Sequence, residues 1–290
     1  SKDNIESWSS EWFERLSSHL ELQDLIKNPS IHLLVHHSIE TAAVFFERLE
    51  MDKKLQDLIL GPLGLPSKRL TYLLAFCAFL HDIGKTNAGF QLRSSNALRA
   101  YNILHQGNGT RKSTVKEKFF HTDASKIIFD DIVIPYLIDR YFGSLLSGNR
   151  PKDKKSWIRF LSQVSNSVCG HHGFPPTKWP KNEMMGPLAP ASINKLGFSS
   201  QDEEFVKTMI HLGEEIFLKD LDPIPCPTKE TLRALRTRVE WTLASHMNTS
   251  DWLASTEEYF PFSITFSHSE LEWKTARPKA RAALKSSGHT

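Results

Sequence analysis

The chain has 290 residues, of which 40% are hydrophobic, and its formal net charge is +3. These values predict a globular protein with a sizeable core, arranged in one large domain or two small ones. The longest apolar run, Leu70 to Leu80, is too short to span a bilayer, and the N-terminus lacks the order of a signal peptide, so we expect a soluble cytoplasmic protein. The first residue is serine, which indicates a trimmed start. Three cysteines, odd in number and far apart, argue against a disulfide framework or a zinc ribbon.

Most segments of the chain show helical spacing of apolar residues, and few alternate with period two, so the sequence predicts an all-α protein. Ile31 to Leu49 carries one apolar stripe. Tyr72 to His81 is apolar on nearly every face, which indicates a central buried helix that ends near Gly84. Phe119 to Leu146 is expected to be a helix that kinks or breaks near Pro135, because proline lacks the N–H donor that a helix interior requires.

Later segments with the same helical spacing are Ser156–Cys169, Ser200–Leu218, Thr228–Met247 and a short basic helix at Lys274–Lys285. Between the first two of these, residues 174–200 contain five prolines and should be irregular. Asp251 and Trp252 follow the third segment closely. We find no internal repeat and expect one compact helical domain.

The string His81-Asp82-Ile83-Gly84-Lys85 stands at the end of the central apolar run. Adjacent imidazole and carboxylate groups can hold a divalent metal, and a water on such a metal ionises near neutral pH. The motif therefore points to metal-assisted hydrolysis. A His-Asp pair alone is equally compatible with a polar helix end, so the supply of further ligands decides between the two interpretations.

Further candidate ligands occur in separate segments of the chain. Together with the first pair, the candidate metal ligands are His37, His81, Asp82, His121, His171, His172 and Asp251. This number is about what two divalent ions need when solvent and substrate oxygens complete their coordination. Asp82, with two oxygens, could bridge both ions. The imidazoles favour transition ions such as Mn, Fe, Co or Ni over Mg alone.

Positive charge is concentrated in two stretches. Residues 85–118 hold seven basic side chains against one acidic, and residues 150–159 hold five against one. Such stretches are usually solvated loops, yet two of them around a metal site suit a polyanion. Phe90, Trp179 and Trp252 could stack on bases, although core packing is the better interpretation of Trp252.

These motifs, in their order along nearly the whole chain, resemble the HD nuclease domain of the CRISPR-associated helicase-nuclease from type I interference systems. The segments that carry the resemblance are His37-Ser-Ile-Glu-Thr-Ala-Ala-Val44, His81-Asp-Ile-Gly-Lys85 with Gly89-Phe90-Gln91, His121 with Ser125, Gly170-His-His-Gly-Phe-Pro175 and Asp251-Trp-Leu-Ala-Ser255. Glu40 stands where the family commonly has Asp, and Ser250 where it usually has Ala. No G-x-x-x-x-G-K-[ST] phosphate loop is present, so the ATP-driven helicase half is absent from this chain.

The resemblance implies an all-helical HD domain over residues 1–290, with a core at about 28–260, and two-metal cleavage of single-stranded DNA. The ligands would divide into a first set of His37, His81, Asp82 and Asp251, and a second set of His121, His171 and His172 with Asp82 as the bridge. Lys85 would act beside Asp82 by offsetting phosphate charge, and a lysine favoured by a helix dipole is an equal alternative. The implied partners are single-stranded DNA, a helicase in cis or trans, and the crRNA-guided surveillance complex.

Two other functions stay open. An HD phosphohydrolase acting on nucleotides or cyclic dinucleotides would share the metal chemistry, but a small-molecule pocket does not call for two basic stretches. The Gly-Tyr-Pro signature of the cyclic-dinucleotide group is also missing after His171 and His172. A helical adaptor with a structural or degenerate metal site would be non-catalytic, but a decayed site usually loses a ligand.

Overall fold

The computed structural model describes residues 33–86, 121–148, 150–170, 200–263 and 268–289. Every regular element in these ranges is helical, so the prediction of an all-α fold is confirmed. The α-helices there are α3 (Leu34–Met51), α4 (Lys53–Ile59), α5 (Ser67–Phe79), α8 (His121–Ile128), α9 (Ile134–Tyr141), α10 (Pro151–Cys169), α11 (Ser200–Phe217), α12 (Lys229–Ala234), α13 (Glu240–Ala254) and α14 (Ser269–Ser286). None of these helices has the length and apolar character needed to cross a membrane.

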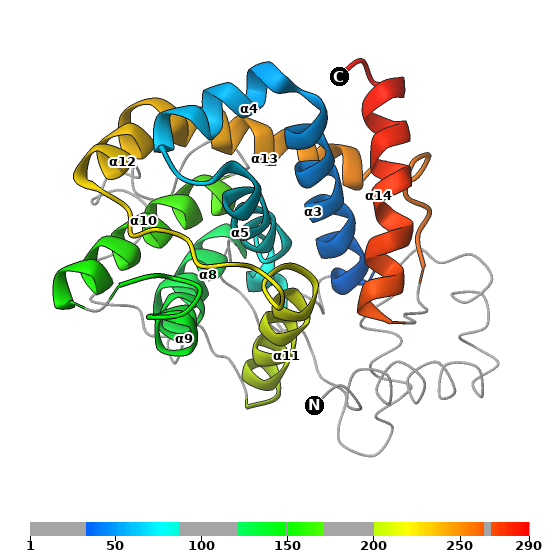
Figure 1. Cartoon of the computed structure of the whole chain (residues 1–290). Helices are drawn as coiled ribbons and strands as arrows, with labels where there is room; N and C mark the ends of the chain where they lie inside the picture. Colours follow the sequence, from blue (N-terminus) through cyan, green and yellow to red (C-terminus); the bar gives the residue numbers. More distant parts are fainter. Residues whose placement is uncertain (1–32, 87–120, 149, 171–199, 264–267, 290) are drawn as a thin grey trace, which may run out of the picture.

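Helix α5 lies at the centre of the molecule, where it packs against α3, α10 and α11 (Figure 1). Every side chain from Leu73 to Leu80 is buried, as the continuous apolar run predicts. Burying one large aliphatic or aromatic side chain contributes about 1.5–3 kcal/mol, so this helix is a major source of stability. The helix ends at Phe79, earlier than predicted. His81 and Asp82 therefore lie in the turn that follows the helix.

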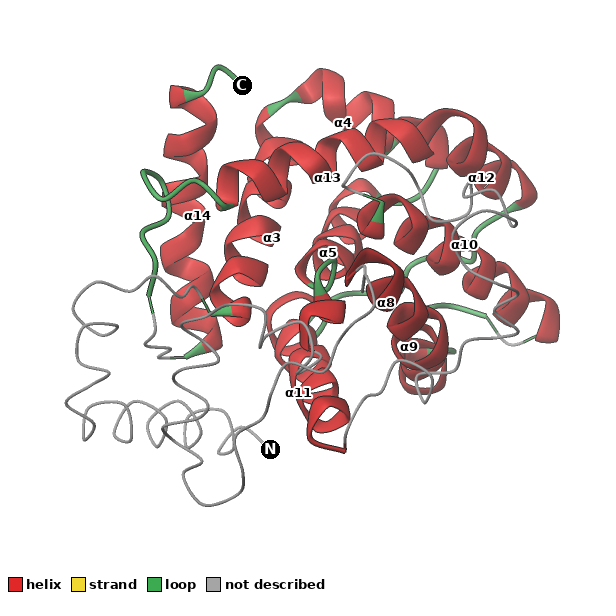
Figure 2. Cartoon of the chain, turned by 180° about the vertical axis from the view of Figure 1, so that it is seen from behind, coloured by secondary structure: helices red, strands yellow, loops and turns green. Residues whose placement is uncertain are grey.

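Helix α3 packs against α5, α13 and α14 and is buried along most of its length. Helix α14 runs beside it in both views (Figures 1 and 2). Toward the end of α3, the buried carboxylate of Glu47 is bound by Arg277 and Arg281 of α14. Near the start of α3, His36 Nδ1 lies 3.7 Å from Glu272 Oε2 of α14. The C-terminal helix thus contacts α3 at both ends.

The helix predicted over residues 119–146 is described from His121, and it ends earlier than predicted, at Tyr141. Helix α8 continues through the π-helical turn η4 (Phe129–Val133) into α9, which has Pro135 in its first turn, and the backbone is helical at both junctions. The irregularity predicted near this proline is therefore a π-helical turn within the helix, of the kind that bends a helix without ending it. The helix ends at Tyr141 because the backbone of Phe142 is extended.

Helices α12 and α13 join through the π-helical turn η7 (Leu235–Val239) into one continuous rod from Lys229 to Ala254. Thr228 caps its start by accepting a hydrogen bond from a backbone N–H of the first turn. The predicted end at Met247 is wrong, because Leu253 is buried and continues the apolar stripe. Asp251 consequently projects from within a helix, which fixes its direction better than a loop would.

Some predicted features lie outside the described ranges. They are His171, His172, Phe90, Trp179, the irregular segment 174–200 and most of the basic stretch 85–118.

Candidate metal centre

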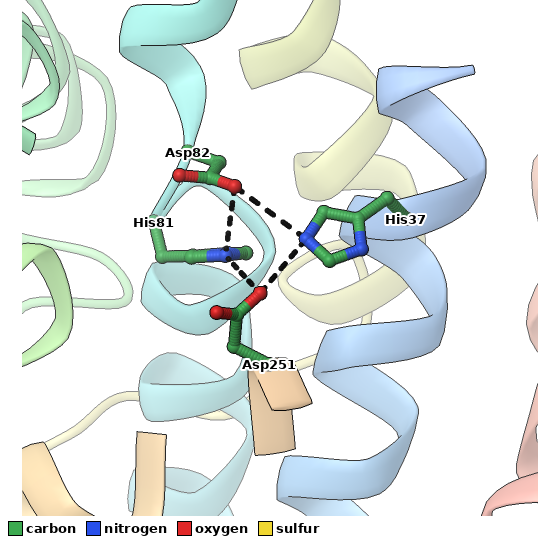
Figure 3. Close-up of side chains that lie close together, drawn as sticks. All are labelled: His37, His81, Asp82 and Asp251. Atoms are coloured by element: carbon green, nitrogen blue, oxygen red, sulfur yellow. Dashed lines mark ion pairs between the residues drawn. The ribbon is translucent and has the colours of Figure 1, made fainter. Parts of the chain in front are cut away.

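Four side chains from three distant parts of the chain meet just beyond the end of α5 (Figure 3). One donor atom of each of His37, His81, Asp82 and Asp251 lies within 4.8 Å of the other three. His37 Nε2 is 3.0 Å from Asp251 Oδ1 and 3.4 Å from Asp82 Oδ2. His81 Nε2 is 3.4 Å from Asp251 Oδ1 and 3.3 Å from Asp82 Oδ2. Two nitrogens and two oxygens thus face one another in an alternating ring.

Each of the four side chains is placed by an element that the apolar core holds in position. His37 projects from the first turn of α3, Asp251 from the last turn of α13, and the His-Asp pair from the turn after α5. His81 Nδ1 donates a hydrogen bond to the carbonyl oxygen of Ala78, 2.8 Å away. This bond directs Nε2 into the ring, which is the usual arrangement of an imidazole that binds a metal.

The second oxygen of Asp82 faces a fifth predicted ligand. His121 Nε2, in the first turn of α8, lies 3.3 Å from Asp82 Oδ1. Gly84 permits this approach, because a Cβ at that position would lie 2.2 Å from the carbonyl oxygen of His121. The Gly84 N–H also donates to Ser125 Oγ, at 2.8 Å. The prediction that Gly84 marks a helix end is wrong: α5 stops at Phe79, and the glycine serves the packing of α8.

Lys85 belongs to the 3-10 turn η3 (Ile83–Thr86), directly beside the carboxylate of Asp82. Its Nζ lies 2.5 Å from Asp82 Oδ2, and 25% of its side chain is exposed while that of Asp82 is fully buried. A partly exposed side chain thus carries positive charge to the buried carboxylate. From this position a lysine can contact an anion that approaches the ring.

Mutual attraction within the ring outweighs the cost of burial. Burial alone lowers the pKa of His81, but the charge of Asp82 and the hydrogen bonds to Asp251 and Asp82 raise it to about 9. Burial also lowers the pKa of His37, and hydrogen bonds to Asp251 and Asp82 reverse this into a net rise. The pKa of each carboxyl is raised by burial and lowered further by the neighbouring imidazoles, so both stay well below their usual range.

The donor set fits a divalent cation. An ion midway between two donor atoms 4.8 Å apart would lie 2.4 Å from each of them. This distance is near the roughly 2.0–2.2 Å of imidazole and carboxylate bonds to transition ions. Imidazole nitrogens with carboxylate oxygens are the ligands of Mn, Fe, Co and Ni sites. Two carboxylates held in their charged form in the interior also call for positive charge between them. These four residues could therefore hold one ion, and His121 faces the oxygen that remains for another.

The remaining predicted residues are more scattered. His36, next to the ligand His37, faces α14 and not the ring, because adjacent side chains of a helix point about 100° apart. Trp252 is 64% exposed, so the prediction that it packs in the core is wrong. The basic stretch 150–159 is exposed on the first turns of α10. Helix α10 has 19 residues and is roughly 28 Å long, so this stretch and Gly170 lie at opposite ends.

One contribution to the site is absent from the predicted set. The carbonyl group of Ala78, which orients His81, was not predicted from the motif. The position of Ala78 near the end of α5 could have indicated this role. The last carbonyl groups of a helix have no partner within the helix and accept hydrogen bonds from side chains nearby.

Comparison with known proteins identifies the family. The family model described as "Cas3, HD domain" matches residues 23–260 of the chain. The CRISPR-associated endonuclease/helicase Cas3 of Escherichia coli (strain K12) is 25% identical over 235 residues, which are 80% of this chain and 24% of that protein. The chain thus spans about a quarter of the length of that relative.

Solved structures show the same fold. The Thermus thermophilus Cas3 HD domain in the presence of Ni2+ matches with a TM-score of 0.55 and 17% identity, covering 90% of this chain and 88% of that one. A chain of a CRISPR RNA-guided surveillance complex in a pre-nicking state matches with a TM-score of 0.56 and 20% identity, covering 89% of this chain and 28% of that one. Because the family model matches most of its residues, the chain belongs to the Cas3 HD domain family.

Proposed function

We propose that this chain is a metal-dependent nuclease domain that hydrolyses phosphodiester bonds of single-stranded DNA in type I CRISPR interference. The observation that carries the proposal is the convergence of His37, His81, Asp82 and Asp251 within 4.8 Å. We take residues 1–290 as one HD nuclease domain, because α14 packs on α3 beyond the end of the family match at residue 260.

The seven predicted ligands would form two sets that share one carboxylate. Asp82 would contribute Oδ2 to the first set, together with His37, His81 and Asp251, and Oδ1 to the second, together with His121. His171 and His172 are assigned to the second set from the family motif alone. When bound, divalent ions such as Mn, Fe, Co or Ni, with Mg as a further candidate, supply Lewis-acid activation of water and neutralise phosphate charge.

The protein's own groups would position the substrate strand. Lys85 is partly exposed beside the ring, so its ammonium group would contact a phosphate oxygen and offset charge that develops in the transition state. The apolar core below the ring, formed by the end of α5, excludes water from the buried side of the carboxylates. A phosphodiester would therefore approach from the side on which Lys85 and Asp251 reach solvent.

The partners of the domain would be a helicase, in cis or in trans, and a crRNA-guided surveillance complex. The name of the Escherichia coli relative combines endonuclease with helicase, and one structural match comes from a CRISPR RNA-guided surveillance complex. Membership of this family favours the nuclease over a nucleotide phosphohydrolase or a non-catalytic adaptor.

A cleavage assay across metals tests the proposal. The purified chain is incubated with single-stranded DNA, duplex DNA and a panel of nucleotides, each with Mn, Co, Ni, Fe or Mg and with EDTA. We expect single-stranded DNA to be shortened with at least one transition ion, and to stay intact in EDTA. Release of phosphate from nucleotides while the DNA stays intact would instead support the phosphohydrolase.

A further inference from the structure

Helix α13 presents an exposed face with a tryptophan at each end. Trp241 is 48% exposed and Trp252 is 64% exposed, two of the five most exposed large apolar side chains in the described part of the chain. A separation of 11 residues amounts to about three helical turns, so both indoles point the same way. Ser245 and Asn248, both exposed, lie between them on this face. We call these four residues the α13 stripe.

Positive charge precedes the α13 stripe along the same helical rod. Arg233, Arg236 and Arg238, in α12 and the π-helical turn η7, are all exposed. None of the three forms an ion pair with another residue in the described ranges. Arginines in this state have donors available for phosphate groups. Figure 2 shows the rod crossing the upper part of the molecule from α12 to the far end of α13.

The far end of the stripe is one residue along α13 from a ligand of the candidate metal centre, and about 100° around the helix from it. Trp252 follows Asp251, whose carboxylate belongs to the ring of four ligands. The tryptophans are 11 residues apart, or about 16 Å along the axis. The exposed acids Glu257 and Glu258 lie beyond this end. Charge therefore changes from basic, on the part of the rod far from the centre, to acidic just beyond the end of α13.

We infer that the α13 stripe is a track for single-stranded DNA, on which Trp241 and Trp252 stack with bases while the arginines hold the backbone. The inference rests on the proposed nuclease function and names the surface that would lead the strand to the centre. Exposed indoles need unpaired bases, because the base faces of a duplex are covered by their neighbours. The arginines supply the electrostatic part of the affinity, which the acids beyond α13 do not.

Binding assays with two kinds of strand separate stacking from charge. The metal-loaded chain is titrated into a fluorescein-labelled phosphorothioate oligodeoxythymidylate, which resists hydrolysis, and into a strand of the same length built from abasic residues. The double variant Trp241→Ala/Trp252→Ala should bind the oligodeoxythymidylate about 100-fold more weakly, at about tenfold per indole, and bind the abasic strand like the wild type. Trp252→Phe should retain most of the affinity.

Arginine and control variants complete the test. Arg236→Ala should weaken binding of both strands and reduce the slope of log affinity against log salt by about 1. Leu271→Ala on α14, which removes another exposed apolar side chain, and Lys279→Ala, which removes an exposed lysine there, should bind both strands like the wild type. Thermal unfolding checks that the tryptophan variants keep their fold.

The outcomes distinguish this inference from the function on which it rests. A wild-type chain that cuts single-stranded DNA, while the double variant binds the oligodeoxythymidylate equally well, would overturn the track and leave the nuclease intact. The exposed face would then belong to a protein partner. A wild-type chain that binds through the tryptophans and cuts no DNA with any divalent ion would overturn the proposed nuclease function. The proposal that the α13 stripe binds single-stranded DNA would then still hold.

Discussion

Asp82 is a fully buried carboxylate whose two oxygens face different histidines and a lysine. Burying a charged carboxylate costs several kcal/mol unless positive charge and hydrogen bonds offset the loss of water. Without a metal, that positive charge comes from Lys85 and the protonated imidazoles. Protons and a metal ion therefore compete for the same ring.

This competition predicts that metal binding releases protons. The pKa of His81 is raised to about 9, so its imidazole is protonated at pH 7 and must lose that proton to bind an ion. Metal affinity should therefore rise with pH up to about 9. In the metal-free chain the raised pKa contributes stability that is present below 6.5 and is lost as the pH rises through about 9.

Isothermal titration with Mn²⁺ in two buffers of different ionisation enthalpy measures the released protons. We expect net release at pH 7 that declines toward pH 9. An affinity that does not change between pH 6 and 9, with no proton release, would show that this imidazole does not bind the ion.

Lys85 should matter for catalysis more than for metal binding. The variant Lys85→Ala removes the charge of a partly exposed side chain beside Asp82, so we expect DNA cleavage to fall about 10- to 100-fold with unchanged metal content. Lys85→Arg should recover part of the rate, because it keeps the charge. Lys126, which pairs with Asp130, offers a control: Lys126→Ala should leave the cleavage rate per folded molecule near that of the wild type. Full activity of Lys85→Ala would favour a purely structural lysine.

The contact between η3 and α8 depends on one missing side chain. In Gly84→Ala the new Cβ would meet the backbone of His121 and Ser125 at 2.2 Å and 2.6 Å. Backbone atoms cannot rotate away, so we expect the free energy of unfolding to fall by about 1–3 kcal/mol and His121 to shift away from Asp82. Urea unfolding measures the first effect, and metal content measures the second.

Gly61→Ala is the matched control for this substitution, because nothing lies within 4 Å of a Cβ at that position. Its stability should stay within about 0.5 kcal/mol of the wild type. Equal stability of the two alanine variants would mean that α8 can move without cost.

The helices with long apolar stripes were predictable from the sequence. Helix α5 was found because its core-facing run leaves no polar face, and α3 because its stripe is sustained over several turns. Helix α4 has seven residues and buries only Leu55 and Ile59, too few to give a periodic signal. The π-helical turns η4 and η7 were missed because one extra residue in a turn shifts the stripe without ending the helix.

The chemistry of the centre was easier to predict than its geometry. Metal ligation needs particular side chains, so the motifs identified His37, the His-Asp pair, His121 and Asp251, which the structure brings together. That they bind a metal stays a prediction. The exposure of Trp252 was predicted wrongly, because residue type favours burial and only the packing of α13 decides which face meets solvent.

The fold continues beyond the part that matches the family. Helix α14 follows residue 260, where the family match ends, and its side chains Ala280 and Leu284 are fully buried in the common core. Its arginines bind the buried Glu47 on α3, the helix that also carries His37. The C-terminal helix therefore supports the helix that provides the first ligand.

The variant Glu47→Ala tests this support. It removes the charged acceptor of Arg277 and Arg281, so the free energy of unfolding should fall by about 2 kcal/mol, measured by urea denaturation. Asp57→Ala breaks the exposed pair with Lys53 and should cost less than about 1 kcal/mol. A Glu47→Ala variant as stable as Asp57→Ala would mean that α14 contributes little to the fold.

Counting bound ions tests most directly whether the converging side chains form a metal centre. Wild-type chain loaded with Mn²⁺ and freed of excess ion by gel filtration should retain two ions, and Asp57→Ala should match it. Asp82→Ala should retain fewer than one ion while its circular dichroism stays helical, because the shared carboxylate is lost. A wild type that retains no ion, or an Asp82→Ala variant that retains as many as the wild type, would contradict the proposed centre.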